Sequence, residues 1–106
     1  MRRNSAIVPG DGIGVEVTRE AVRVMRAAVA QDDLEFRVEM FPYGADHYLE
    51  TGETLPAESL ERFRSFDGIL MGAFGDPRVP DMRHARDILL GTRFELDLFA
   101  NIRPVK

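Results

Sequence analysis

The sequence predicts an α/β fold with a largely parallel sheet. Two short apolar runs are each followed directly by a glycine-rich turn, Gly10–Gly14 and Gly72–Gly75. Apolar residues at helical spacing follow the first turn, and a segment of alternating apolar and polar residues comes next. A strand, a helix and a strand in this order favour a parallel β-α-β unit with a right-handed crossover.

The first β-α-β unit is predicted between residues 5 and 40. Ser5–Pro9 is expected to be a short buried strand, because its central residues are all apolar. From Val15 to about Gln31 the apolar residues fall on one helical stripe, which we expect to face the core. The residues of this stripe are Val17, Ala21, Val24, Met25, Ala28 and Val29. Leu34–Met40 alternates apolar and polar residues, which predicts the second strand.

The rest of the chain predicts two further helices and two further strands. Residues 42–51 are expected to be loop-like or weakly helical. The later elements are a helix from Pro56 to Asp67, a strand at Ile69–Met71, a helix from Arg83 to about Leu96 and a strand at Leu98–Ile102. The sequence stops in this apolar segment rather than in a polar linker, so we expect a fragment of a longer protein, an incomplete domain.

Composition excludes several classes of protein. The chain has 106 residues, a net charge of −4 and no cysteine, which excludes disulfides and thiolate metal sites. Its two histidines, His47 and His84, are too few for a His-rich metal cluster and are expected at the surface. The negative charge argues against nucleic acid as a partner. No apolar run approaches the roughly 18 residues of a membrane helix, and no secretory signal follows Met1, so we expect a cytoplasmic protein.

The two glycine-rich turns lie where open α/β sheets bind ligands, directly after their strands. A glycine lets the backbone approach a ligand because it has no Cβ. The first turn does not match a dinucleotide-binding fingerprint, since Val15 stands where the third glycine is required. Spacing alone therefore favours a tight strand-to-helix turn, and Asp11 suits a helix cap as well as a functional carboxylate.

Two arginines are candidate anion ligands. Arg93 lies late in the predicted third helix, and Arg103 lies at the end of the strand that follows. Guanidinium groups from adjacent elements can converge on one carboxylate and hold it with bidentate hydrogen bonds. Spacing alone favours surface ion pairs with Glu95 or Asp97 instead, and Leu89–Leu90 is more typical of core than of pocket lining.

Three segments together resemble the metal-dependent β-decarboxylating dehydrogenases, the isocitrate/isopropylmalate dehydrogenase family. They are Ile7–Val17, Leu70–Pro77 and Leu89–Pro104, and they occur in the order of the family. The resemblance is closest to the 3-isopropylmalate dehydrogenase branch. It implies that residues 1–106 form the first half of a discontinuous cofactor- and substrate-binding domain. The acid–base and metal-binding residues of the family would lie beyond Lys106, so we expect no catalytic residue and no metal ligand within this chain.

The resemblance assigns binding roles to particular residues. Arg93 and Arg103 would grip a carboxylate of a 2-hydroxy acid, while Leu89 and Leu90 would face the substituent on its C3. The residues implied beside the nicotinamide half of NAD are Gly72, Ala73, Phe74, Gly75 and Asp76. The other implied partners are Mg²⁺ or Mn²⁺, held by ligands downstream, and a second subunit of a homodimer.

The reaction that the resemblance implies is NAD-dependent oxidative decarboxylation, with 3-isopropylmalate as the expected substrate. In the isocitrate branch, polar residues hold an extra carboxylate where this chain has Asp87 and Leu89. A buried carboxylate without a donor is costly, which argues against isocitrate. D-malate or tartrate as substrate and NADP as cofactor stay open. A non-catalytic regulatory subunit that binds an acid or nucleotide, and a stand-alone α/β binding module, are the alternatives from other classes.

Overall fold

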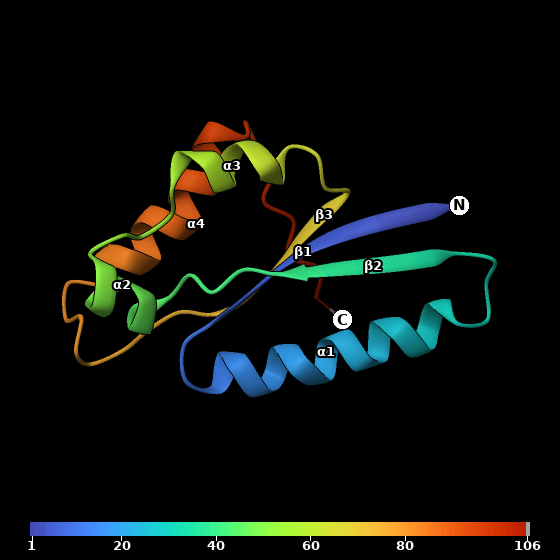
Figure 1. Cartoon of the computed structure of the whole chain (residues 1–106), viewed down its shortest axis with the longest axis horizontal. Coiled ribbons are helices and arrows are strands. Elements are labelled where there is room, and N and C mark those ends of the chain that lie inside the picture. The colour runs from blue at the N-terminus through green and yellow to red at the C-terminus, as the bar shows by residue number, and fades with distance from the viewer. Residues whose placement is uncertain (106) are drawn as a thin grey trace.

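The computed structural model describes residues 1–105 and confirms the α/β class (Figure 1). Its elements are β1 (Arg2–Gly10), α1 (Ile13–Val29), β2 (Glu35–Met40), α2 (Ala45–Thr51), α3 (Ala57–Phe63), β3 (Gly68–Ala73) and α4 (Arg83–Glu95). The described strands form one sheet in the order β2-β1-β3, and both pairings are parallel. The predicted parallel β-α-β unit is therefore present.

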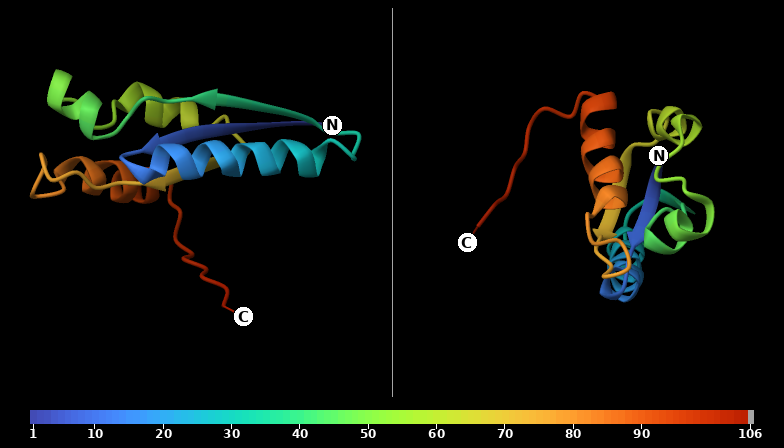
Figure 2. Two further views of the ribbon diagram at one scale, coloured as in Figure 1. Left: turned by 90° about the horizontal axis from the view of Figure 1, so that it is seen from below. Right: turned by 90° about the vertical axis from the view of Figure 1, so that its left-hand side faces the viewer.

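The sheet is covered on both faces (Figures 1 and 2). α1 lies along one face, while α3 and the end of α4 pack against the other. Ala6 and Val8 of the central strand contact Phe41 and Phe63, and the two phenylalanine rings meet edge to face at 5.0 Å. This aromatic contact adds to the hydrophobic stabilisation of the core. The core thus fixes β1 in the centre, with its carboxyl end beside that of β3.

The face of α1 that packs on the sheet agrees only in part with the predicted stripe, of which Ala21, Met25 and Val29 are half-buried. Val17 and Val24 are 56% and 68% exposed, whereas Gly14 and Thr18 are buried. The physical reason is the close approach of the helix to the sheet: a Cβ at Gly14 would lie 2.7 Å from the backbone of Ala73. Small side chains at the helix start therefore decide which face is buried, and hydrophobicity alone does not.

Several boundaries move by a few residues. β1 begins at Arg2 because Arg2 pairs with Glu35 both in the strand register and through a 3.2 Å ion pair. The weakly helical stretch becomes α2 and ends at Gly52, whose φ of 77° suits a glycine cap. Pro56 stands at the N-cap of α3. The longest described helix has 17 residues, and none in residues 1–105 is long and apolar enough to cross a bilayer.

The predicted strand at Leu98–Ile102 is wrong. Residues 98–105 form no helix or strand, and they run away from the sheet (Figure 2). Their apolar side chains lie open to solvent, with Phe99 91% and Ile102 82% exposed. A strand needs a neighbouring strand to satisfy its backbone groups, and no described strand runs beside this segment. An apolar segment alone was therefore not sufficient to predict a strand here.

Candidate functional site

The carboxyl ends of the three parallel strands meet at one edge of the sheet, where such sheets bind ligands. β1 ends at Gly10, whose φ of 84° brings it so close to Ala73 that a Cβ would overlap the Ala73 carbonyl. The Asp11 amide then donates a 2.7 Å hydrogen bond to that same carbonyl. Glycine at position 10 is thus required for the two glycine-rich turns to lie side by side.

Asp11 connects three elements at this edge through its side chain. Its Oδ1 accepts a 2.6 Å hydrogen bond from the Ala45 amide at the start of α2. Its Oδ2 accepts a 2.9 Å bond from the Gly75 amide and lies 2.7 Å from Nε2 of His84 on α4. We call Asp11, Ala45, Gly75 and His84 the Asp11 junction. The helix cap considered for Asp11 is not formed, since α1 has no side-chain cap.

The Asp11 carboxylate is held in its ionised form. Burial raises the pKa of Asp11, but hydrogen bonds from Ala45, His84 and Gly75 outweigh burial and bring the pKa below its usual value. An ionised carboxylate only accepts hydrogen bonds. Nε2 of His84 is therefore the donor in this pair.

His84 is fully buried, which corrects the expectation that it lies at the surface. Tyr48 stacks on its ring at 6.2 Å between centroids, and Nδ1 has no hydrogen-bond partner among the described residues. The sequence held a signal for this burial, because His84 lies one turn before the buried Ile88 on the same face of α4. His47 is partly exposed and pairs with Glu53 at 2.9 Å.

Most polar groups of the Gly72–Asp76 loop are already occupied. Phe74 packs against the core, and the Gly75 amide is taken by Asp11. Arg78 hydrogen-bonds Asp76, which lowers the pKa of Asp76 to about 2. The same guanidinium reaches Asp46 on α2 at 2.5 Å, so a second contact ties this loop to α2.

Arg93 borders a hollow of about 330 Å³ beside β3, which we call the Arg93 hollow. Its lining residues are Ile69, Met71, Gly72, Leu89, Thr92, Arg93 and Leu98. The hollow therefore brings together residues from two of the resembling segments: Gly72 from Leu70–Pro77, and Leu89 and Arg93 from Leu89–Pro104. Arg93 is exposed and forms no ion pair with Glu95 or Asp97 in the described structure.

Other predicted residues lie outside this hollow. Leu90 is 39% exposed and does not line it. Arg103 lies in the extended segment after Leu98, where its Nε is 3.4 Å from Oδ1 of Asn101. The structure does not bring Arg103 to Arg93, because the strand that was expected to carry Arg103 is not formed. The role of Arg103 stays a prediction.

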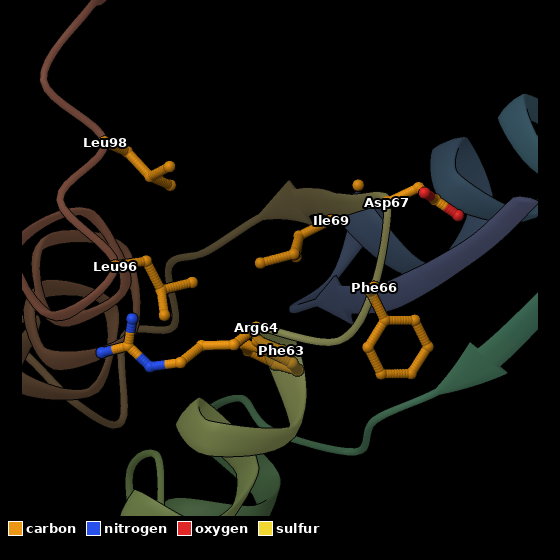
Figure 3. A pocket seen from close by; sticks show the side chains of 8 residues that line it. Phe63, Arg64, Phe66, Asp67, Ile69, Leu96 and Leu98 are labelled. Atoms are coloured by element: carbon orange, nitrogen blue, oxygen red, sulfur yellow. The ribbon is translucent and has the colours of Figure 1, made fainter.

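A second hollow, of about 380 Å³, adjoins the Arg93 hollow and lies nearer the start of β3 (Figure 3). The two hollows share Ile69 and Leu98. Phe63, Phe66 and Leu96 line it, and the Arg64 side chain extends across toward α4. The Arg64 guanidinium donates a 2.6 Å hydrogen bond to the Glu95 carbonyl at the end of α4. This hollow lies near Gly68, where β3 begins, so it is not at the edge where the strand ends converge.

Three comparisons with known proteins place the chain. The family model for isocitrate/isopropylmalate dehydrogenase matches residues 4–106. A 3-isopropylmalate dehydrogenase from Corynebacterium kroppenstedtii is 48% identical over 93% of this chain, and one from Rhodococcus erythropolis is 48% identical over 95%. The chain spans 29% of the length of each.

A solved structure shares the fold. It is the apo β-decarboxylating dehydrogenase from Thermococcus kodakarensis, with a TM-score of 0.67, 36% identity and coverage of 91% of this chain and 27% of that one. Together with the family match, it shows that the chain belongs to the isocitrate/isopropylmalate dehydrogenase family.

Proposed function

We propose that this chain forms the carboxylate-binding edge of an NAD-dependent enzyme that oxidatively decarboxylates 3-isopropylmalate. The observation that carries the proposal is the Arg93 hollow, where Arg93 and Leu89 of α4 lie beside β3 between Ile69 and Gly72. Family membership supplies the reaction class. The expected homodimer and the cytoplasmic location remain predictions.

Within the hollow, the side chains divide the work of binding. Arg93 is free of ion pairs in the described structure, so its guanidinium can hold a substrate carboxylate through charge-assisted bonds. Leu89 and Met71 provide an apolar wall that suits a short aliphatic substituent. Arg103 would join the site only if the segment after Leu98 turned back toward β3. Leu90 lies on α4 itself, outside the hollow.

The glycine turn is open to solvent at Gly12. A Cβ at Gly12 would meet no atom within 4 Å, and the neighbouring Ile13 is 69% exposed. An apolar surface beside open backbone suits the face of a nicotinamide, which when bound accepts the hydride. In the Gly72–Asp76 loop, the Gly75 amide is bonded to Asp11 and the Asp76 carboxylate to Arg78. We therefore propose that Gly75 and Asp76 fix the shape of the loop rather than contact the cofactor through these groups.

The described residues supply no metal site of their own. No group of three or more His, Asp or Glu side chains that could hold an ion occurs among residues 1–105. The Mg²⁺ or Mn²⁺ that the family implies finds no such group among residues 1–105.

The polar groups of α4 argue against isocitrate as the substrate. Asp87 accepts a 3.0 Å hydrogen bond from Thr54 and does not line the Arg93 hollow, so it supplies no donor to an additional carboxylate there. Leu89, on the wall of the hollow, offers no donor to one. Leu89 and Met71 can contact an alkyl substituent. D-malate and tartrate lack such a substituent, so we expect them to bind more weakly.

An NADH absorbance assay tests the proposal. The 106-residue chain with NAD⁺, Mg²⁺ and 3-isopropylmalate is expected to show no turnover. A chimera that joins it to the remaining segment of the Corynebacterium kroppenstedtii relative should reduce NAD⁺ faster with 3-isopropylmalate than with D-malate or tartrate. Arg93→Leu in the chimera should lower kcat/KM at least about tenfold, the value of one charge-assisted bond, while Arg19→Leu on α1 serves as the matched control.

Each outcome of this assay has a defined meaning. Turnover by the 106-residue chain would contradict the proposed role as one part of a larger site. A folded chimera that binds 3-isopropylmalate without reducing NAD⁺ would contradict the proposal that these 106 residues form part of a catalytic site. Preference for D-malate or tartrate would overturn the choice of substrate.

A further inference from the structure

We propose that Asp11 and His84 are a positioning pair for the ligand-binding edge, an inference that rests on the proposed function. Through this pair the β1–α1 turn would set the direction of the Gly72–Asp76 loop and the place of α4. Neither side chain lines the Arg93 hollow, so their effect on ligands would pass through the residues they hold.

The geometry of the Asp11 carboxylate leaves little freedom to its partners. Each of its oxygens accepts from a backbone amide, Ala45 on one side and Gly75 on the other. His84 Nε2 donates to the oxygen that also serves Gly75, so the imidazole and the loop share one acceptor. Loss of the imidazole would free both the direction of the carboxylate and the turn at Gly75.

The pair also fixes one end of the helix that carries the hollow. His84 lies in the first turn of α4, and Leu89 and Arg93 follow on the same helix. The far end of α4 is held by the hydrogen bond from Arg64 to the Glu95 carbonyl. Because α4 is anchored at both ends, release of the His84 end would tilt Leu89 and Arg93 relative to β3.

The chemistry of position 84 favours a directional role over simple packing. Nδ1 of His84 is buried without a partner among the described residues, which is unfavourable for stability. A leucine would fill a similar volume without that penalty. The contribution of His84 therefore comes from its directed hydrogen bond to Asp11, which an apolar side chain cannot form.

Two variants of position 84 separate direction from packing. His84→Gln can still donate an N–H to Asp11, whereas His84→Leu keeps apolar volume and loses the donor. Amide hydrogen exchange of Gly75 and Ala45, normalised to the core amide of Ile7, should accelerate at least about tenfold in His84→Leu and stay within about threefold of wild type in His84→Gln. Arg19→Gln, at an exposed position of α1, serves as the control and should leave both amides unchanged.

Ligand affinity links the pair to the proposed function. Titration of NAD⁺ and of 3-isopropylmalate should give dissociation constants at least about fivefold weaker in His84→Leu, with recovery in His84→Gln. Imidazole ¹⁵N shifts should show a proton on Nε2 of His84, the atom that donates to Asp11. Unchanged Gly75 exchange in a folded His84→Leu, or equal losses in both variants, would overturn the positioning role. If the wild-type chain binds neither ligand, the proposed function is wrong. The amide-exchange rates then still test whether Asp11 and His84 position the Gly75 turn.

Discussion

The Asp11 junction and the segment Leu98–Val105 are opposite cases within one small chain. Asp11 and Gly75 of the junction, and residues 98–104 of the segment, lie in stretches that resemble the family. In the junction, a buried carboxylate receives three hydrogen bonds from three elements. In the segment, Phe99 and Val105 are more than nine-tenths exposed, and Arg103 contacts only its neighbour Asn101.

The difference shows what determines order at this edge of the sheet. The junction has its partners within residues 11–84, so local close approach and hydrogen bonding complete it. The segment has apolar side chains suited to a strand, but no described strand lies beside it. Order at Arg103 would therefore require a further surface, whereas order at Arg93 follows from α4 itself.

The largest expected effect comes from disturbing the close approach behind the junction. A Cβ at Gly72 would overlap the Pro9 carbonyl of β1 and lie 2.5 Å from the Thr18 hydroxyl. Gly72→Ala should therefore lower the free energy of unfolding by roughly 4 kcal/mol or more. Gly91→Ala is the matched control, because a Cβ there meets open space within α4 and should stabilise by about 0.5–1 kcal/mol. Urea denaturation of both variants checks the contrast, and equal stabilities would refute it.

A pair of phenylalanine truncations compares the core with the segment directly. Phe63 is 2% exposed and packs on Phe41, while Phe99 is 91% exposed. Phe63→Ala should cost about 3–5 kcal/mol of unfolding free energy, and Phe99→Ala should change it by less than about 0.5 kcal/mol. A cost at Phe99 above about 1 kcal/mol, measured by thermal or urea unfolding, would mean that the segment packs in solution.

A smaller effect is expected from acid. Because the pKa of Asp11 in the folded chain lies below its usual value of 3.8, its contribution to stability is complete above about pH 4. That contribution is lost as the pH falls through the folded pKa. Asp11→Asn should therefore be less stable than wild type at neutral pH and show a shallower loss between about pH 4 and pH 2. Urea unfolding midpoints measured across this pH range test the prediction, with Asp33→Asn in an exposed loop as the control. Parallel pH dependences of Asp11→Asn and wild type would contradict it.

Regular elements with clear periodicity could be predicted from sequence. The first β-α-β unit, β3 and α4 follow from apolar runs, glycine turns and helical spacing, and their errors are a few residues at the ends. The buried face of α1 could not be predicted from hydrophobicity, because Gly14 and Thr18 pack closer to the sheet than the larger valines can.

The candidate site was only partly accessible to sequence reasoning. Spacing placed Arg93 and Leu89 on one helix, but it did not show that Gly72 shares their hollow. The Asp11–His84 pair joins residues 73 positions apart, a contact that no local pattern encodes. The expected strand at Leu98–Ile102 failed because pairing depends on a neighbour that lies outside the segment.

The most direct test of the central claim is a titration of the 106-residue chain with 3-isopropylmalate, followed by backbone amide shifts. Saturable shifts should appear at Gly72, Leu89 and Arg93 and weaken at least about tenfold in Arg93→Gln, while Arg19→Gln should match wild type. Shifts confined to Phe66 and Leu96 in the second hollow would contradict the proposal that the Arg93 hollow binds the substrate carboxylate. An unchanged affinity in Arg93→Gln would contradict it as well.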